Sequence, residues 1–201
     1  MKKLSRGLVT VLVLVVLLFG IGSCAVGKYN TLIALDESVT TQWAQVQNQY
    51  QRRLDLIPNL VSTVKGYAKH ESDVFTQVSE ARASAGGQVN IDADVLNDPA
   101  AFEKYQKIQD NLSGSLQRLL MVTEQYPELK ADQQFLALQD QLEGTENRIA
   151  VERQRFNDVA KSYNTAIRSF PTRIIASFAH LEKKSYFAAS TEAQNAPKVE
   201  F

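Results

Sequence analysis

The chain has 201 residues, with 22 basic and 22 acidic side chains, one cysteine and two histidines. This length accommodates a membrane anchor and one domain of roughly 170 residues. A single cysteine excludes an internal disulfide framework and a thiolate metal cluster, and two histidines leave little for imidazole chemistry.

The balanced charge conceals an asymmetry along the chain. Four basic residues, Lys2, Lys3, Arg6 and Lys28, precede the first acidic residue, Asp36. The rest of the chain holds 18 basic against 22 acidic side chains, which gives it a net charge near −4. A nucleic-acid partner requires a basic face that displaces counterions, so this charge argues against such a partner.

An apolar run near the N-terminus predicts a membrane anchor in residues 1–27. Residues 7–26 form a stretch of 20 residues without a charge, about the length that spans the hydrocarbon core. The basic start "MKKLSRG" favours the cytoplasmic side of the membrane. We therefore expect the remainder to lie outside the cytoplasm, in the periplasm or at the cell surface.

The segment "IGSC" allows two interpretations of Cys24. It resembles a bacterial lipobox, in which the signal peptide is cut before a cysteine that then carries lipid. Alternatively, Cys24 is a small apolar residue that ends a transmembrane helix. Both interpretations leave the domain outside the cytoplasm and tethered to a membrane.

Beyond the anchor, apolar residues recur at spacings of three and four, the pattern of amphipathic helices. The breaks in this pattern predict helices at 29–55, 58–86, 99–125 and 131–170. Pro58 predicts a tight turn in "DLIPN", with a continuous kinked helix as the alternative. Asp98 and Pro99 predict an N-cap and a first helical position.

Short connections at two of the three joints favour antiparallel neighbours. The sequence therefore predicts an all-α domain over 28–187, an antiparallel up-down four-helix bundle preceded by the membrane anchor. The final stretch "SYFAASTEAQNAPKVEF" predicts a loosely held tail, and we assign residues 188–201 as flexible.

The alternating direction of the helices places the first turn about 40 Å from the membrane. A partner surface formed by Arg52, Arg53, Asp55 and Asn59 is one interpretation of the charges there. The other is a set of ion pairs from the arginines to acidic residues in 124–132, which would fasten the turn.

The same reasoning places the segment after Pro171 beside the bilayer. Arg173, Ile174, Ile175 and Phe178 then form a short interfacial helix that contacts membrane lipid. Alternatively, this segment folds back and caps the open end of the bundle.

No sequence pattern for catalysis or metal binding stands out. The chain has no Gly-rich phosphate loop, no G-x-S-x-G elbow and no paired histidines at metal spacing. Neither histidine follows a glutamate at the Glu-x-x-His spacing of a di-iron bundle. We therefore expect no catalytic residue, no metal and no cofactor.

Three strings, "RRLDLIPNLV", "LEGTENRIA" and "YNTAIRSFPTRIIA", strongly resemble the LemA family. With their surroundings they cover nearly the whole chain after the anchor. The resemblance implies an N-terminal membrane anchor and an antiparallel four-helix domain outside the cytoplasm, and it brings no catalytic residues. This chain departs from the common pattern at Leu54, where alanine is common, and at Ala188, where an acid is more usual.

Together these observations predict an interaction or scaffold module of the bacterial cell envelope. It is single-pass or lipid-anchored, and its partners are membrane lipid and an unidentified envelope protein. The alternatives are an envelope enzyme or regulatory subunit with an unrecognised site, and a lipid- or peptidoglycan-sensing module that uses residues 171–184.

Overall fold

The computed structural model describes residues 6–88 and 91–188, which form helices and no strand. In chain order these are α1 (Arg6–Tyr67), α2 (Ser72–Gly86), the 3-10 helix η1 (Ala93–Asn97), α3 (Pro99–Thr123), α4 (Pro127–Lys130), α5 (Gln133–Arg168) and α6 (Thr172–Phe178). The all-α prediction is confirmed. The predicted flexible tail, 188–201, lies outside the described residues except for Ala188.

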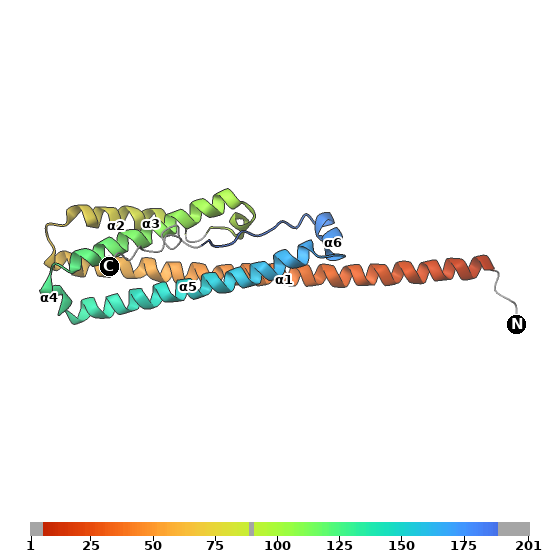
Figure 1. The fold of residues 1–201 in the computed structure, drawn as a ribbon, viewed down its shortest axis with the longest axis horizontal. Helices are drawn as coiled ribbons and strands as arrows, with labels where there is room; N and C mark the ends of the chain where they lie inside the picture. Colours follow the sequence, from red (N-terminus) through yellow and green to blue (C-terminus); the bar gives the residue numbers. More distant parts are fainter. Residues whose placement is uncertain (1–5, 89–90, 189–201) are drawn as a thin grey trace, which may run out of the picture.

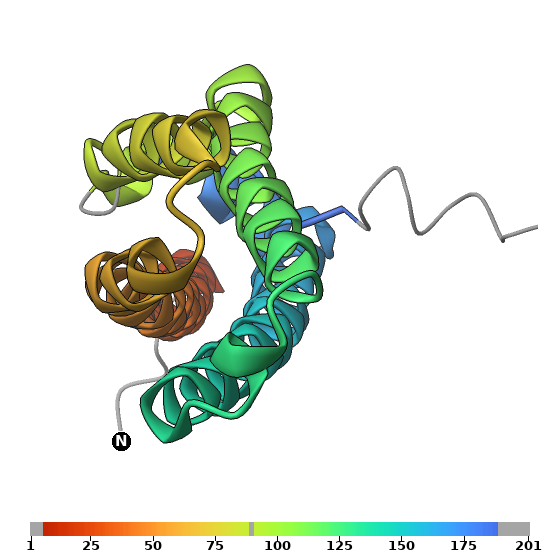
Figure 2. The same cartoon turned by 90° about the vertical axis from the view of Figure 1, so that its left-hand side faces the viewer.

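Four long helices alternate in direction along the domain, as Figure 1 shows. α1 packs along α5, and α2 packs along α3. Viewed from the end, α1 and α2 lie on one side of the domain and α3 and α5 on the other (Figure 2). The first part of α1 projects from this domain without neighbours among the described helices (Figure 1).

The projecting part of α1 is the predicted anchor. Within the described residues, α1 is the one helix long and apolar enough to cross a membrane. Its apolar side chains from Leu8 to Val26 are exposed, whereas Leu32 and Val39 are fully buried in the domain. One helix thus contains both the apolar run and a wall of the domain core, with no linker between them.

The tight turn predicted at Pro58 is wrong, because α1 continues through this proline to Tyr67. A proline inside a helix has no N–H to donate to the carbonyl four residues earlier, here that of Leu54. Arg82 of α2 takes the place of this donor: its Nε donates to the Leu54 carbonyl oxygen at 3.2 Å. The alternative of a continuous helix is therefore the one observed.

The connection between the first two helices lies at residues 68–71, so the predicted helix 58–86 is shortened to α2. Two tyrosines join this connection to the α4 region at the same end of the domain (Figure 1). Tyr67 donates to Asp132 at 2.7 Å, and Tyr126 donates to Glu71 at 3.2 Å.

α3 and α5 each begin after an aspartate cap, and the cap at Asp98 is the one that the sequence predicts. The Asp98 side chain accepts from the backbone N–H groups of Ala100 and Ala101 at 2.9 and 3.2 Å. The Asp132 side chain accepts from the N–H of Phe135 at 2.9 Å. These aspartates satisfy N–H groups that the first helical turn leaves without partners.

The core has two parts along the helix axes. The part nearer the anchor is rich in aromatic side chains, which include Trp43, Tyr50, Phe102, Tyr105, Phe156, Tyr163 and Phe187. The part nearer α4 is mostly aliphatic and includes Leu54, Ile57, Leu60, Val64, Leu112, Leu119 and Leu142.

Candidate functional site

Cys24 lies in the exposed, apolar part of α1 and forms no disulfide. The helix runs through this position without a break, from Arg6 onward. Both interpretations of Cys24 stay predictions, since a lipidated N-terminus and an uncleaved span alike keep the following helix intact.

The candidate partner residues Arg52, Asp55 and Asn59 are exposed along one face of α1. They do not lie at the end of the domain, because α1 continues beyond them to Tyr67. At 1.5 Å per residue, the three side chains lie about 12–23 Å before the end of the helix. The prediction that these residues lie at the end of the domain farthest from the membrane is wrong, because α1 does not turn at Pro58.

Arg53 is buried, with 1% of its surface exposed, and so it does not contribute to that exposed face. Its guanidinium donates to Glu146 at 2.9 Å, to Ser113 at 2.7 Å and to the Gln109 side chain at 2.6 Å. The prediction that Arg53 pairs with acids in 124–132 is therefore wrong: its carboxylate partner is on α5. A signal was available, because Arg53 follows Tyr50 by three residues in the apolar stripe.

A second arginine, partly buried, lies next to the first. Arg153 donates through Nε to the Tyr50 hydroxyl at 2.7 Å and through Nη2 to Asp110 at 3.2 Å. Burial alone would lower the pKa of Arg153, but Tyr50 and Asp110 outweigh it and raise that pKa. Burial raises the pKa of Tyr50 against the opposing charges of Arg153 and Arg53.

These two arginines fasten α1, α3 and α5 to one another. The carboxylates of Glu146 and Asp110 each pair with a different arginine and so do not converge on a common point. In the described part of the chain, no three His, Cys, Asp or Glu side chains come together in a group suited to a metal ion. The arrangement therefore suits a structural network that fixes the register of three helices.

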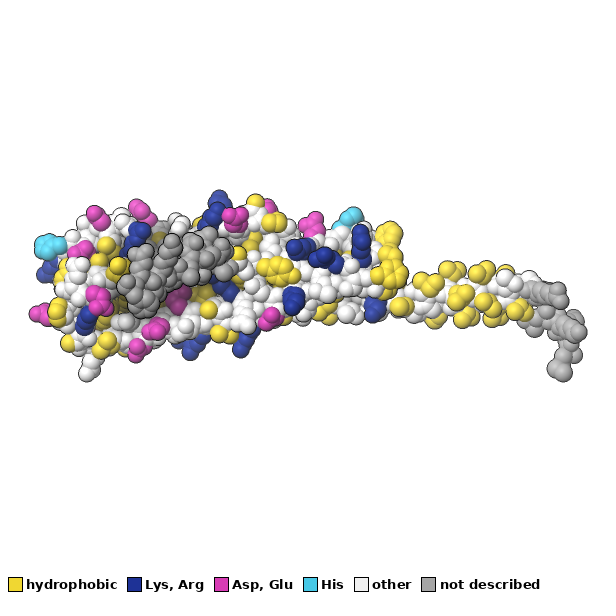
Figure 3. All heavy atoms as spheres, viewed as in Figure 1, with side chains coloured by type: hydrophobic (Ala, Val, Ile, Leu, Met, Phe, Trp, Pro, Cys, Tyr) yellow, Lys and Arg dark blue, Asp and Glu magenta, His cyan; other side chains and the backbone are white. Residues whose placement is uncertain are grey.

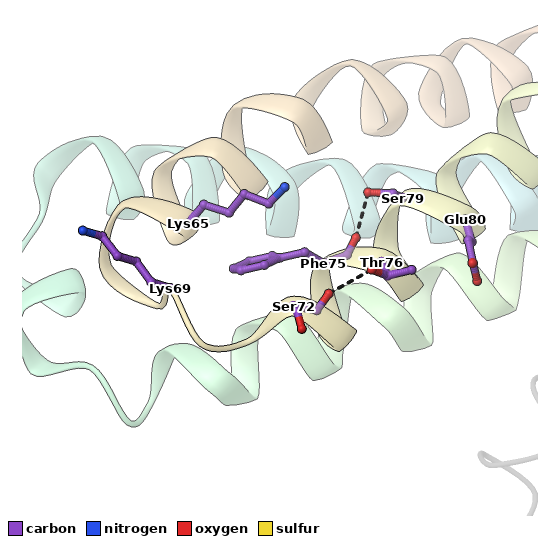
Figure 4. Close-up of a pocket in the computed structure, with 7 residues that line it drawn as sticks. All are labelled: Lys65, Lys69, Ser72, Phe75, Thr76, Ser79 and Glu80. Atoms are coloured by element: carbon purple, nitrogen blue, oxygen red, sulfur yellow. Dashed lines mark hydrogen bonds between the residues drawn. The ribbon is translucent and has the colours of Figure 1, made fainter.

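A shallow groove lies between the end of α1 and the start of α2 (Figure 4). Lys65 and Lys69 lie on one side of it, and the Lys65 ammonium lies 5.2 Å from the centre of the Phe75 ring. The hydroxyls of Thr76 and Ser79 donate to backbone carbonyls of their own helix, at 3.0 and 2.7 Å. The protons of these two hydroxyls are therefore engaged within α2.

Residues 184–188, here called the strap, run in an extended conformation back along the domain from α6 (Figure 1). Asn164 donates to the Lys184 carbonyl and accepts from the Lys184 N–H, both at 2.9 Å. Asn157 pairs with both backbone groups of Phe187 in the same way, at 3.0 and 2.9 Å. A carboxamide suits this task because it carries both a donor and an acceptor.

The side chains of the strap complete the core. Phe187 is buried, and its ring centre lies 4.9 Å from that of Phe102 and 5.4 Å from that of Phe156. The Lys184 ammonium pairs with Asp36 of α1 at 2.9 Å. The expectation of a loosely held tail is therefore wrong for residues 185–187 of that stretch, and the tail bounds of 188–201 stay a prediction.

The four candidate membrane-contact residues divide between two faces of α6. Ile175 packs against the aromatic part of the core, next to the buried Ala176. Ile174 and Phe178 face outward, with 51% and 84% of their surfaces exposed, and Arg173 is exposed as well. One face of α6 thus covers the end of the core, while the other is exposed among the residues that the structure describes.

Comparison with known proteins gives consistent results. The sequence model of the LemA family matches residues 42–201. Magnetosome protein MamQ 2 of Paramagnetospirillum magneticum is 25% identical over 203 residues, covering 92% of this chain and 75% of that protein. MamQ of Magnetospirillum gryphiswaldense is 26% identical, covering 80% and 64% of the two chains. Protein LemA of Metamycoplasma hominis is 26% identical, covering 82% and 71%.

Proposed function

Since the chain belongs to the LemA family, we propose that it is a membrane-tethered helical module of the bacterial cell envelope that acts by binding. The observation that carries this proposal is the continuity of α1. Its apolar part and its domain part form one helix of 62 residues. A partner bound to the domain would thus be held at a fixed height above the membrane, as a scaffold requires.

We propose that α1, α2, α3 and α5 form an antiparallel up-down four-helix bundle over residues 28–187. Their alternating directions and the pairing of α1 with α5 and α2 with α3 support this arrangement. The ion pairs of Arg53 and Arg153 and the contacts of the strap hold the helices together. A rigid domain of this kind suits binding better than a function that requires conformational change.

The proposed orientation has the N-terminus in the cytoplasm and the domain in the periplasm or at the cell exterior. Lys2, Lys3 and Arg6 before the apolar run support it. A cysteine placed at the exposed Lys104, in a chain that carries Cys24→Ser, tests the orientation in intact cells. We expect a membrane-impermeant maleimide to label it without lysis, and labelling only after lysis would contradict the orientation.

The proposed partner surface is the exposed face of Arg52, Asp55 and Asn59. Residues spaced by three and four share one face of a helix, and the Gln51 side chain donates to Asp55 at 2.7 Å along it. A photo-crosslinking residue at Arg52 or Asn59 should give a discrete adduct in living cells. The matched control is Lys104 on α3, and equal adduct formation there would refute the surface.

We propose that the N-terminal segment remains as an uncleaved span. The intact mass of the protein purified from membranes tests this directly. An unchanged N-terminus supports the span, whereas loss of residues 1–23 with added acyl mass at Cys24 makes the protein a lipoprotein.

A further inference from the structure

Three large apolar side chains at the membrane-proximal end of the domain are left uncovered by the described part of the chain. Phe170 and Phe178 are each 84% exposed, and Ile174 is 51% exposed. They are spaced by four residues, and we call them the membrane-proximal patch. Figure 3 shows hydrophobic side chains gathered at this end of the domain, where the narrow apolar shaft of α1 leaves it. Singly exposed apolar residues are ordinary, but such a cluster marks a contact surface.

The height of this patch along α1 coincides with the edge of the bilayer. The inner face of α6 packs in the same core cluster as Leu32 and Leu35. Leu32 is six residues beyond Val26, the end of the apolar run, which corresponds to about 9 Å along the helix axis. The headgroup layer extends roughly 5–8 Å beyond each side of the hydrocarbon core. With the apolar run spanning that core, the patch lies beside or within the headgroups.

The charges around the patch complement anionic lipid. Lys28, Arg168, Arg173 and Lys183 are exposed at this end of the domain. The exposed acids nearest to them in sequence are Glu182 and Glu37. Figure 3 shows Lys and Arg side chains close to the apolar cluster. Basic side chains near a bilayer surface attract the phosphates of anionic lipids, and aromatic side chains favour the interface between lipid and water.

We propose that Phe170, Ile174 and Phe178 insert into the headgroup layer of the leaflet from which α1 emerges, with the surrounding basic side chains on anionic phospholipid. This inference rests on the proposed anchoring of α1 in the membrane. It adds a second contact with the same bilayer, away from the axis of α1. A domain held at two points cannot rotate about α1, so the face of Arg52, Asp55 and Asn59 keeps one direction relative to the membrane.

The test places a fluorescent probe on single cysteines in the full-length chain with Cys24→Ser. The protein is reconstituted in vesicles of phosphatidylcholine and phosphatidylglycerol that contain lipids with quenchers at known depths. Phe178→Cys reports the patch and Leu14→Cys reports the anchor. Met121→Cys is the matched control, since Met121 is 69% exposed on α3 and lies far from the anchor in sequence and fold. Because Phe178 is so exposed, its replacement leaves the core intact.

We expect quenching at position 178 by shallow quenchers, quenching at position 14 by deep ones, and none at position 121. Replacing phosphatidylglycerol by phosphatidylcholine should reduce quenching at 178 and leave 14 unchanged. If the probe at position 178 is not quenched while the probe at position 14 is, the inference is overturned and the proposed anchoring stays intact. If the probe at position 14 is not quenched, the proposed anchoring of α1 is wrong, and the inference about the membrane-proximal patch falls with it. A probe at 178 that is shielded in proportion to protein density, and not quenched by lipid, assigns the patch to a second copy and overturns the inference.

Discussion

The unbroken path of α1 through Pro58 makes a quantitative prediction about Arg82. A proline in a helix interior costs about 3 kcal/mol or more, in part because it leaves a carbonyl without its N–H donor. Arg82 donates to that carbonyl, on Leu54, at 3.2 Å. Removal of Arg82 should therefore cost more in the native chain than in one where residue 58 has its own N–H.

The magnitude follows from the nature of the bond. A hydrogen bond from a charged donor contributes about 1.5–3 kcal/mol when buried, and an ordinary one about 1 kcal/mol. Because Arg82 is largely exposed, Arg82→Ala should lower the free energy of unfolding by about 1 kcal/mol. In the Pro58→Ala background, the new N–H satisfies the Leu54 carbonyl. There the same Arg82→Ala change should cost less than about 0.5 kcal/mol, a coupling energy of roughly 0.5–1 kcal/mol.

The assay is urea unfolding of the full-length protein in detergent micelles, followed by the fluorescence of Trp43. This residue is the single tryptophan and is 2% exposed in the folded domain. Arg118→Ala is the matched control, since Arg118 also bonds across helices, to Gln77 at 3.1 Å, but shares no partner with Pro58. The effects of Pro58→Ala and Arg118→Ala on the free energy of unfolding should add within about 0.5 kcal/mol. A coupling of zero between Pro58 and Arg82 would show that this bond does not account for the continuous helix.

Three further predictions concern the core and are measured in the same unfolding assay. Phe187→Ala should cost about 3–5 kcal/mol, as deletion of a buried aromatic ring does. The neighbouring Tyr186→Ala, at a position 39% exposed, should cost less than about 1 kcal/mol, and equal costs would contradict the structural role of the strap. Arg53→Ala should cost about 1–3 kcal/mol because the buried Gln109 side-chain oxygen loses its charged donor, while the part-exposed Glu146 is solvated by water; Arg52→Ala should stay within about 0.5 kcal/mol. Burial raises the pKa of Tyr163 to about 12, so its contribution to stability is complete below about pH 10 and is lost as the pH rises through 12. Tyr163→Phe should remove this part of the alkaline loss, and an unchanged pH profile would refute it.

The parts of the fold that the sequence predicts well are those set by neighbouring residues. Asp98, the predicted N-cap of α3, accepts from N–H groups two and three residues later. Such contacts depend on local sequence alone. As a result, α3 begins at the predicted Pro99, whereas α5, for which no cap is predicted, begins two residues after its predicted start.

The parts that sequence reasoning misses are those decided by distant partners. The local sequence at Pro58 favours a break in the helix, but Arg82 on another helix donates to the Leu54 carbonyl and the helix continues. The strap has no periodicity to recognise, since its backbone partners are the amide side chains of Asn157 and Asn164. Arg53 was assigned to the surface from its charge, and its partners come from α3 and α5.

The length of α1 sets what the proposed partner surface can reach. Arg52 and Asn59 lie 26 and 33 residues beyond Val26, which places them about 40–50 Å above the hydrocarbon edge along the helix axis. Because no linker interrupts α1, this height does not vary as it would on a flexible tether. A partner at this face must therefore be an envelope component that lies at that height, or a membrane protein whose outer domain extends as far. The proposed insertion of the membrane-proximal patch would also fix rotation about α1, and would then select among those partners by direction as well as by height.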